Sequence, residues 1–310
     1  MTAHPSRNDV IAVDSLRMCY GTKDVLRDVT FHARRGEVLA LLGPNGAGKT
    51  TTIEILEGFR MRSAGQVSVL GVDPAEGDEQ WRARMGIVLQ SWRDHGKWRV
   101  REFLAYQASY YTPYSSDQTP RPWDVDELLA AVGLTSHANA KIKTLSGGQR
   151  RRLDVAVGLV GRPELLFLDE GTAGLDPQAR REFHSLVRNV ADELDTTILI
   201  TTHDLDEAAK LADRIVILAG GRIVADGTSA ELARQIAGED EVSWTQDGRR
   251  FTHSTHDSTA FVRDLLNREG AAVGELAVRR ASLEDTYLTL VRQAESDKGD
   301  TEVHDLEGAA

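Results

Sequence analysis

A short apolar stretch, VLALL (Val38–Leu42), runs directly into the octamer GPNGAGKT (Gly43–Thr50), and a helical pattern continues from Lys49 to about Gly58. This succession of strand, glycine-rich loop and helix fits the pattern G-x-x-x-x-G-K-[ST] in the context that the pattern requires. The glycines allow backbone N–H groups to converge on phosphate oxygens, and the helix N-terminus adds a partial positive charge. The sequence therefore predicts an α/β fold built around a nucleotide-phosphate site.

The side chains of this octamer indicate how a nucleotide would be held. Lys49 is placed to reach the β- and γ-phosphates, and the Thr50 hydroxyl is placed to ligate Mg²⁺. The alternative is a chance glycine-rich turn, and the complete octamer with its flanking strand and helix argues against it. The residues expected to bind the nucleotide here are Gly43, Pro44, Asn45, Gly46, Ala47, Gly48, Lys49, Thr50 and Thr51.

A second apolar strand, LLFLD (Leu165–Asp169), ends in a carboxylate and is followed by Glu170. Downstream of a phosphate-binding loop this is the Walker B pattern, whose carboxylate holds Mg²⁺, so Asp169 is a candidate metal ligand. A carboxylate beside the metal can orient or deprotonate the attacking water. Glu170 is therefore a candidate catalytic residue, and the alternative is an ordinary loop acid.

The segment LSGGQ (Leu145–Gln149) stands at the predicted start of a helix. Two glycines and a serine at a helix N-terminus suit a bound anion, whereas the alternative is an ordinary N-cap at Ser146. Two phosphate-binding loops for one nucleotide make sense only if two chains face each other. Ser146, Gly148 and Gln149 are then candidate ligands of the partner chain's nucleotide.

Buried strands alternate with helical patterns over most of the chain, which predicts a mostly parallel sheet covered on both faces. The expected strands are 10–20, 25–31, 38–42, 66–70, 86–90, 165–169, 196–201 and 215–218. The expected helices are 49–58, 100–111, 124–132, 149–161, 177–193 and one from about 204, with a proline-rich surface loop at 112–123.

The pattern changes after about residue 238. Strands at 241–245, 249–253 and 272–278, with helices near 257–268 and 282–293, predict a small α+β unit. The final stretch is acidic and lacks periodicity, which predicts disorder. The expected organisation is a disordered N-terminus (1–9), a main domain (10–238), an α+β extension (239–294) and an acidic disordered tail (295–310).

Composition excludes several classes of protein. The chain has 310 residues and 41% apolar residues, which suits about two domains. Its 37 basic and 48 acidic residues leave a formal net charge of −11, so we expect no nucleic-acid partner. The one cysteine excludes an internal disulfide and fits a reducing compartment. We find no signal peptide and no apolar stretch of the ~20 residues that a membrane span needs.

The order of motifs resembles the ATP-binding subunits of ABC transporters: the phosphate loop, Gln90 at a strand end, LSGGQ, LLFLDE, and His203 after a strand. LSGGQ separates this family from other P-loop ATPases, and the resemblance covers roughly residues 10–235. It implies a P-loop NTPase (RecA-like) core with an antiparallel β subdomain and a helical signature subdomain at about 91–160. The C-terminal α+β extension is additional to this core.

The resemblance also implies roles for single residues. Tyr20 resembles the aromatic residue that stacks on adenine, a core tyrosine being the alternative. Gln90 resembles the Q-loop glutamine, which ligates Mg²⁺ and senses the membrane partner. Ala173–Asp176 resembles the D-loop at the dimer seam, and His203 resembles the switch histidine that contacts the γ-phosphate.

Two stretches bear on the partner and the subfamily. Residues 91–101 (SWRDHGKWRVR) follow the Q-loop, where the family receives the coupling helix of its membrane subunit; a solvated basic loop is the alternative. SLEDTYL (Ser282–Leu288) and TIEILEG (Thr52–Gly58) resemble the daunorubicin-resistance type of drug and antibiotic exporter. Gly171 departs from the family, which usually has proline there, and glycine loosens the backbone beside Glu170.

The expected function is therefore the ATP-hydrolysing subunit of a membrane exporter of a drug, antibiotic or other hydrophobic compound. It would use ATP and Mg²⁺, pair with a second ATP-binding subunit as a homodimer, and sit peripherally on the cytoplasmic face of the membrane. Polytopic permease subunits would be separate chains. The alternatives are an importer ATPase subunit, a soluble non-transport ABC ATPase, and a regulatory ATP-binding protein with little turnover.

Overall fold

The computed structural model describes residues 8–89, 95–171, 174–235, 240–255 and 257–279, together with residues 284, 287, 290–292 and 294. The chain divides into two compact units, Met1–Asp226 and Gly227–Ala310. The N-terminus before residue 8, the tail after 294 and most of the SLEDTYL segment lie outside the described residues, so their predicted structure stays a prediction.

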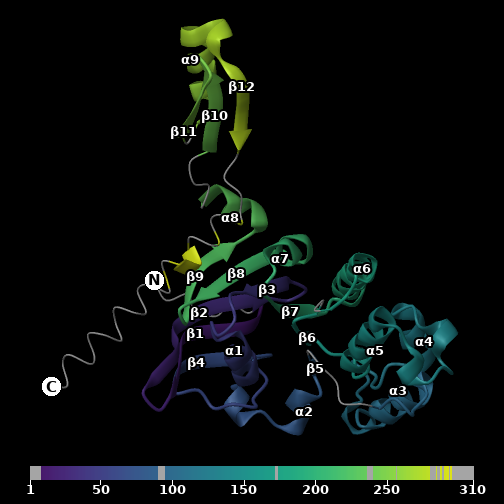
Figure 1. The fold of residues 1–310 in the computed structure, drawn as a ribbon. Coiled ribbons are helices and arrows are strands. Elements are labelled where there is room, and N and C mark those ends of the chain that lie inside the picture. The colour runs from purple at the N-terminus through teal and green to yellow at the C-terminus, as the bar shows by residue number, and fades with distance from the viewer. Residues whose placement is uncertain are drawn as a thin grey trace. The chain divides into compact units, whose positions relative to one another are not determined.

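A six-stranded sheet forms the centre of the first unit, in the order β5-β6-β7-β3-β8-β9 (Figure 1). The pairs β5–β6, β6–β7, β7–β3 and β3–β8 are parallel, as the alternation of strands and helices predicts. These strands are β3 (Val38–Leu42), β5 (Met85–Val88), β6 (Leu165–Asp169), β7 (Thr197–Thr202), β8 (Arg214–Ala219) and β9 (Arg222–Gly227).

A second sheet lies in the same unit and is antiparallel, in the order β2-β1-β4. Its strands are β1 (Asp9–Tyr20), β2 (Lys23–Arg34) and β4 (Ala64–Val69). Partial alternation of apolar and polar side chains in the two N-terminal strands reflects one buried and one wetter face. This sheet is the antiparallel β subdomain that the sequence predicts.

Alternate side chains of the central strands enter two separate cores. Leu166 and Leu168 of β6 pack with α3, α4, α5 and α6 on one face. Leu165 and Phe167 of the same strand enter the other core, which α1 and the antiparallel sheet complete. The parallel sheet is thus covered on both faces. Helices cover one face, and α1 together with the antiparallel sheet covers the other. The α-helices of this unit are α1 (Lys49–Leu56), α2 (Glu79–Arg82), α3 (Val100–Ser109), α4 (Val125–Ala131), α5 (Gly147–Leu159), α6 (Pro177–Leu194) and α7 (Leu205–Leu211).

Helices α3, α4 and α5 pack against one another and form the helical part of the unit (Figure 1). The proline-rich loop between α3 and α4 contains a short 3₁₀ helix, Thr112–Tyr114, and further 3₁₀ turns occur at Pro74–Glu76, Thr135–His137 and Ile142–Thr144. The sequence missed α2 and β9. A four-residue helix is too short to show a helical period, and β9 lacks fully buried residues until its last position.

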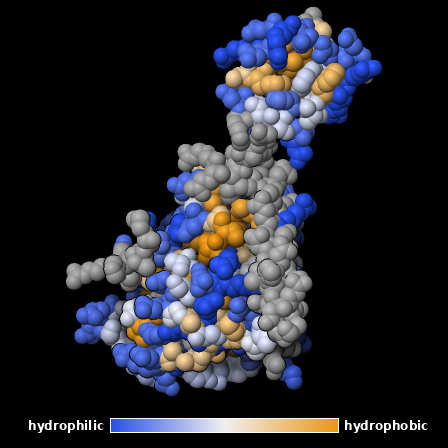
Figure 2. Space-filling model, turned by 90° about the vertical axis from the view of Figure 1, so that its left-hand side faces the viewer, coloured by the Kyte–Doolittle hydropathy of each residue, from blue (hydrophilic) through white to orange (hydrophobic). Residues whose placement is uncertain are grey.

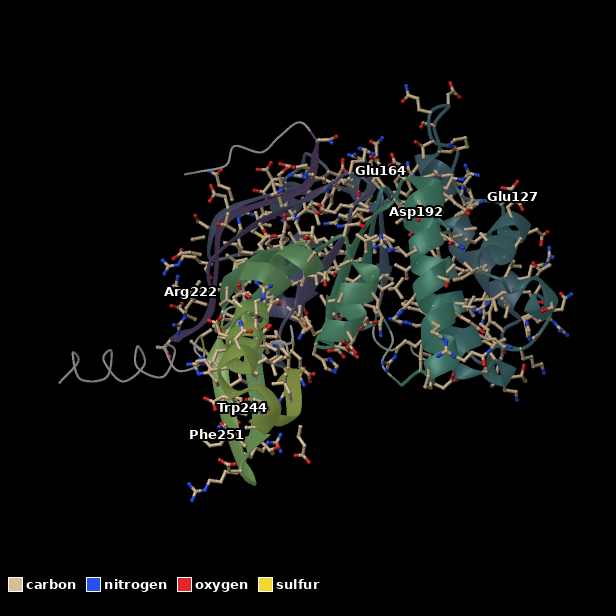
Figure 3. All side chains as sticks on the ribbon, turned by 90° about the horizontal axis from the view of Figure 1, so that it is seen from above. Glu127, Glu164, Asp192, Arg222, Trp244 and Phe251 are labelled. Carbon is tan, nitrogen blue, oxygen red and sulfur yellow. The ribbon has the colours of Figure 1, made fainter. Side chains whose placement is uncertain are left out.

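The second unit contains the antiparallel sheet β11-β10-β12 and is α+β, as predicted. Trp244 of β10 stacks on Phe251 of β11, and both are labelled in Figure 3. Phe261 of α9 packs on Trp244, so α9 lies against this face of the sheet. Figure 2 shows apolar side chains on the surface of this unit, where Phe251, Leu276 and Val278 are exposed. The elements are α8 (Ser229–Gln235), β10 (Asp240–Gln246), β11 (Arg249–Thr255), α9 (Ser258–Glu269), a 3₁₀ turn (Gly270–Ala272) and β12 (Gly274–Arg279).

Candidate nucleotide-binding site

The octamer connects β3 to α1, as the sequence predicts. Gly48 is the N-cap of α1 with φ of 109°, and Gly46 has φ of 80°, values that L side chains rarely adopt. At Gly43 a Cβ atom would lie 2.2 Å from the carbonyl oxygen of Leu218 in β8. The glycines therefore serve the turn and the close approach to a neighbouring strand.

The Lys49 side chain is folded back over this loop. It is 7% exposed, and its Nζ donates to the carbonyl oxygens of Gly43, at 2.7 Å, and Pro44, at 3.1 Å. Burial lowers the pKa of Lys49, and the charges of Glu170 and Asp169 oppose that shift. An ammonium group placed on two carbonyls can exchange them for phosphate oxygens, which carry more charge.

Strand register brings the other charged residues to the same edge of the sheet. Leu42, which precedes the octamer, pairs with Thr202, and Asp169 pairs with Thr201. Because β3, β6 and β7 are parallel, the residues that follow them lie side by side. Glu170 and His203 therefore stand beside the octamer, although 127 and 160 residues separate them from Gly43.

Thr201 of β7 holds both acidic residues and was not a predicted site residue. Its hydroxyl donates a short hydrogen bond to the Asp169 carboxylate. The Glu170 N–H donates to the carbonyl and hydroxyl oxygens of Thr201, each at 3.2 Å. Only the pairing of β6 with β7 reveals this role, because a threonine inside an apolar strand gives no signal in the sequence.

Glu170 and His203 contact each other at the end of these strands. The distance from His203 Nδ1 to Glu170 Oε1 is 3.4 Å, and the His203 side chain is 57% exposed whereas that of Glu170 is 19% exposed. Glu170 has φ of 43°, a left-handed conformation that is strained for a side chain of this kind. Such strain is common in active sites, and here it turns the chain directly after the Walker B aspartate.

Arg151 of α5 ties the loop after Glu170 to the helical part of the unit. Its guanidinium donates to the carbonyl oxygens of Gly171 at 2.7 Å, Leu89 at 2.7 Å and Asp169 at 3.2 Å. A planar group with five donors suits three acceptors that face it from two loops. The signature helix, the Walker B strand and the residue before Gln90 thus meet at one side chain.

The space around Gly171 is limited by a neighbouring side chain. A Cβ atom at this position would lie 2.8 Å from the ring of Phe183 in α6. Gly171 is buried, and its carbonyl accepts the hydrogen bond of Arg151. An aromatic ring therefore occupies the volume that a larger residue would fill.

The LSGGQ segment forms the start of α5. The Ser146 hydroxyl accepts from Gln149 N at 3.3 Å, and the Gln149 side chain accepts from Ser146 N at 3.0 Å. This capping box is the alternative that the sequence left open. Among the described residues, no hydrogen bond or ion pair joins Ser146, Gly148 or Gln149 to the octamer of the same chain.

The remaining predicted residues are placed as follows. Tyr20 ends β1 and is 41% exposed, which is inconsistent with a core tyrosine, and the Arg60 guanidinium lies 5.2 Å from its ring centroid. Thr50 is exposed and Thr51 is half-buried in the first turn of α1. Gln90 and Ala173 lie outside the described residues, so their roles remain predictions.

The geometry defines a nucleotide-hydrolysing P-loop protein with a helical signature segment. Residues 26–173 match the family model of the ABC transporter ATP-binding domain. The chain is 32% identical to the linearmycin resistance ATP-binding protein LnrL of Bacillus subtilis, over 77% of this chain and 76% of that protein. It is 37% identical to the daunorubicin resistance ATP-binding protein DrrA3 of Streptomyces coeruleorubidus, over 74% and 71%.

Further relatives and solved structures agree. The Nod factor export ATP-binding protein I of Cupriavidus pinatubonensis is 34% identical over 92% of both chains. The solved structure of an ATP-binding subunit of an ABC transporter is 28% identical, with a TM-score of 0.60 over 73% of this chain and 92% of that one.

The chain belongs to the ATP-binding subunits of ABC transporters, a family that binds and hydrolyses ATP. ATP-binding cassettes of this family work as dimers with membrane permease partners. No helix among the described residues is long and apolar enough to cross a membrane.

Proposed function

We propose that this chain powers the export of a hydrophobic compound, such as a drug or antibiotic, through polytopic permease subunits on separate chains. Two of the relatives are named for resistance to such compounds, linearmycin and daunorubicin, and a third for export of Nod factor. The observation that carries the proposal is the grouping of Lys49, Asp169, Glu170 and His203 at one sheet edge. The ATPase would sit peripherally on the cytoplasmic face of the membrane.

In the proposed site Lys49 and the octamer backbone bind the β- and γ-phosphates, and Tyr20 stacks on adenine. Glu170 orients the attacking water, and His203 holds the γ-phosphate. The strained turn at Glu170 and the two hydrogen bonds that its N–H donates to Thr201 support this role, because they fix the backbone that carries the carboxylate. The Arg151 guanidinium fixes the backbone on the other side of Glu170.

Thr50, Gln90 and Asp169 would hold Mg²⁺. Among the described residues there is no cluster of three His, Cys, Asp or Glu side chains for a metal. The hydroxyl, amide and carboxylate oxygens of Thr50, Gln90 and Asp169 fit Mg²⁺, because this ion usually takes few protein ligands and completes its shell with phosphate oxygens and water. When bound, the ion neutralises charge that develops on the phosphate oxygens.

The catalytic unit in this proposal is a homodimer. Ser146, Gly148 and Gln149 of one copy would close over the nucleotide on the octamer of the other, because within the described part of the chain no hydrogen bond or ion pair joins them to their own octamer. ATP then bridges the two copies and favours the closed dimer, and its loss favours the open one. Opening and closing would move the permease subunits.

A pull-down from detergent-solubilised native membranes tests the proposal. The bait is tagged Glu170→Gln chain with ATP present, and the matched control is Lys49→Ala. We expect Glu170→Gln to bind ATP, form an ATP-dependent dimer and retain a stoichiometric polytopic protein, identified by mass spectrometry. The Lys49→Ala chain is expected to lose ATP binding. Recovery of the bait with ribosomes, or without any membrane protein, would contradict the transporter function.

A further inference from the structure

Glu207, in the first turn of α7, carries a buried carboxyl group to which the proposed ATPase site gives no role. Its side chain is 4% exposed, and the Thr202 hydroxyl donates to its Oε2 at 2.6 Å. A buried carboxyl group costs free energy unless hydrogen bonds replace the lost water. An apolar residue would cover the end of β7 at no such cost, as Leu205 and Ala208 do on the same helix. The contacts of Glu207 therefore call for an explanation.

Thr202, the last residue of β7, connects Glu207 to the phosphate-binding octamer. Its carbonyl oxygen accepts from the N–H of Gly43, the first residue of the octamer, at 3.2 Å. Its hydroxyl donates to Glu207 and accepts from the N–H of Asp204 at 3.0 Å. A hydroxyl has one proton to donate, so the bond to Glu207 decides which way the lone pairs of that oxygen point. Glu207 thereby sets the geometry in which Thr202 accepts from Asp204.

His203 lies between two residues that Glu207 contacts. Asp204 is the N-cap of α7, and its side chain accepts from the N–H of Glu207 at 3.0 Å. Glu207 thus reaches Thr202 through its carboxyl group and Asp204 through its backbone, one on each side of His203. The His203 side chain is 57% exposed, so packing around the ring contributes little to its position. That position depends instead on the backbone on both sides, which Glu207 holds.

The alternative is that Glu207 serves a contact between α7 and α6. His184 Nε2 of α6 lies 3.9 Å from Glu207 Oε1, and this nitrogen is buried without a hydrogen-bond partner in the described part of the chain. A separation of 3.9 Å is beyond hydrogen-bond reach, whereas the bond from Thr202 is short. Burial also lowers the pKa of His184, so its ring is mostly uncharged at neutral pH and gains little from a nearby acid. The stronger contact of Glu207 is with the end of β7.

We infer that Glu207 is a positioning residue for ATP hydrolysis: through Thr202 and Asp204 it fixes the backbone that carries His203, and so keeps the His203 ring at the γ-phosphate end of the site. The inference rests on the role proposed for His203 and adds how that exposed side chain is held. Glu207 acts through its neighbours and does not contact the nucleotide.

Steady-state phosphate release and ATP titration on the purified full-length chain with Mg²⁺ provide the test. We expect Glu207→Ala to lower kcat about ten-fold or more and to change the dissociation constant for ATP by less than about two-fold. Glu207→Gln keeps an oxygen that accepts from Thr202, so it should retain roughly a third or more of wild-type kcat. The matched control is Asp206→Asn, an exposed acid on the same turn of α7, which should stay within about two-fold.

Repeating the substitution in a His203→Ala chain separates positioning from a general effect on the fold. With no ring left to position, Glu207→Ala should lower the residual kcat by less than about two-fold. An equal loss in both backgrounds would overturn the inference, because Glu207 would then act on the fold or on another group. A loss in His184→Gln as large as that in Glu207→Ala would also overturn it, by assigning Glu207 to the contact with α6.

A spectroscopic measurement decides the question where a variant is too slow to assay or where Glu207→Ala does not fold. In protein with isotope-labelled histidine, the ring resonance of His203 is assigned by its absence from the spectrum of His203→Ala. Thr202→Val has nearly the volume of threonine and removes the hydroxyl that bonds Glu207, so we expect it to shift the His203 resonance. Asp206→Asn should leave that resonance in place. An unshifted resonance in Thr202→Val and Glu207→Gln alike would overturn the inference.

The two proposals fail differently. If His203→Ala leaves kcat unchanged, the role proposed for His203 is wrong, and the inference about Glu207 falls with it. If His203→Ala slows hydrolysis and Glu207→Ala does not, only the role of Glu207 is wrong. Thermal unfolding of each variant checks that it is folded at the temperature of the assay.

Discussion

At the scale of single residues, the site depends on how a few polar side chains are held at the ends of parallel strands. Thr201 forms hydrogen bonds with the Asp169 carboxylate and the Glu170 N–H, and Lys49 donates to two carbonyl oxygens of its own loop. Glu57, the buried C-cap residue of α1, is the contrasting case, since nothing described in the chain holds its carboxyl group.

Thr201→Val is expected to slow ATP hydrolysis about ten-fold or more, because hydrogen bonds to charged groups contribute ~1.5–3 kcal/mol. The dissociation constant for ATP should change little, since Lys49 and the octamer are untouched. Steady-state phosphate release and nucleotide titration measure the two quantities. The control is Thr196→Val. Thr196 is a buried threonine that directly precedes β7, and its hydroxyl donates to the carbonyl oxygen of Pro163. Equal effects of both substitutions would argue against a positioning role.

Glu57→Gln is expected to stabilise the isolated chain at high pH. The folded-state pKa of about 8 lies above the ordinary value of 4.5. The folded state therefore binds the extra proton, and wild-type stability falls as pH rises from about 4.5 through 8. The variant should gain roughly 4 kcal/mol over wild type at pH 8 and less than about 0.5 kcal/mol at pH 4.5. Urea unfolding at the two pH values measures this, and a pH-independent difference would contradict it.

At the scale of elements, the loop after β6 is packed between α5 and α6. Arg151 of α5 bonds its backbone, and Phe183 of α6 fills the space beside Gly171. The three elements are therefore coupled through contacts that no single element would reveal.

Gly171→Ala is expected to destabilise the protein by about 1–3 kcal/mol, because its Cβ would lie 2.8 Å from the Phe183 ring. Phe183→Leu should remove most of that cost, so the two substitutions should be non-additive by about 1 kcal/mol or more. A double-mutant cycle in urea measures the coupling. If the losses in unfolding free energy are additive, the Phe183 ring does not limit the size of the side chain at position 171.

At the scale of the whole molecule, function is proposed to need two copies of the chain. Lys49→Ala would disable the octamer of one copy, and Ser146→Arg would disable its signature segment. Each variant alone should hydrolyse almost no ATP. A mixture creates dimers with one intact composite site, so activity should return to roughly a quarter of wild type if chains assort randomly. A mixture as inactive as its components would contradict a site shared between chains.

Much of the first unit follows from local sequence signals. The octamer, the apolar strands and the start of α5 have the predicted places because each depends on a few adjacent residues. The boundaries of short or half-exposed elements could not be predicted from the sequence. The chain also divides at 226/227 by its contacts, whereas the change of pattern in the sequence falls near 238.

What the sequence by itself determined is the family chemistry: a phosphate-binding loop, a Walker B aspartate followed by Glu170, and a signature segment, each written in a contiguous stretch. What only the tertiary structure decided is which distant residues meet. The bonds of Thr201 to both acids, the space beside Gly171 and the unpartnered carboxyl of Glu57 depend on strand register and packing. Those are relations between elements, and residues far apart in the sequence become neighbours only when the chain folds.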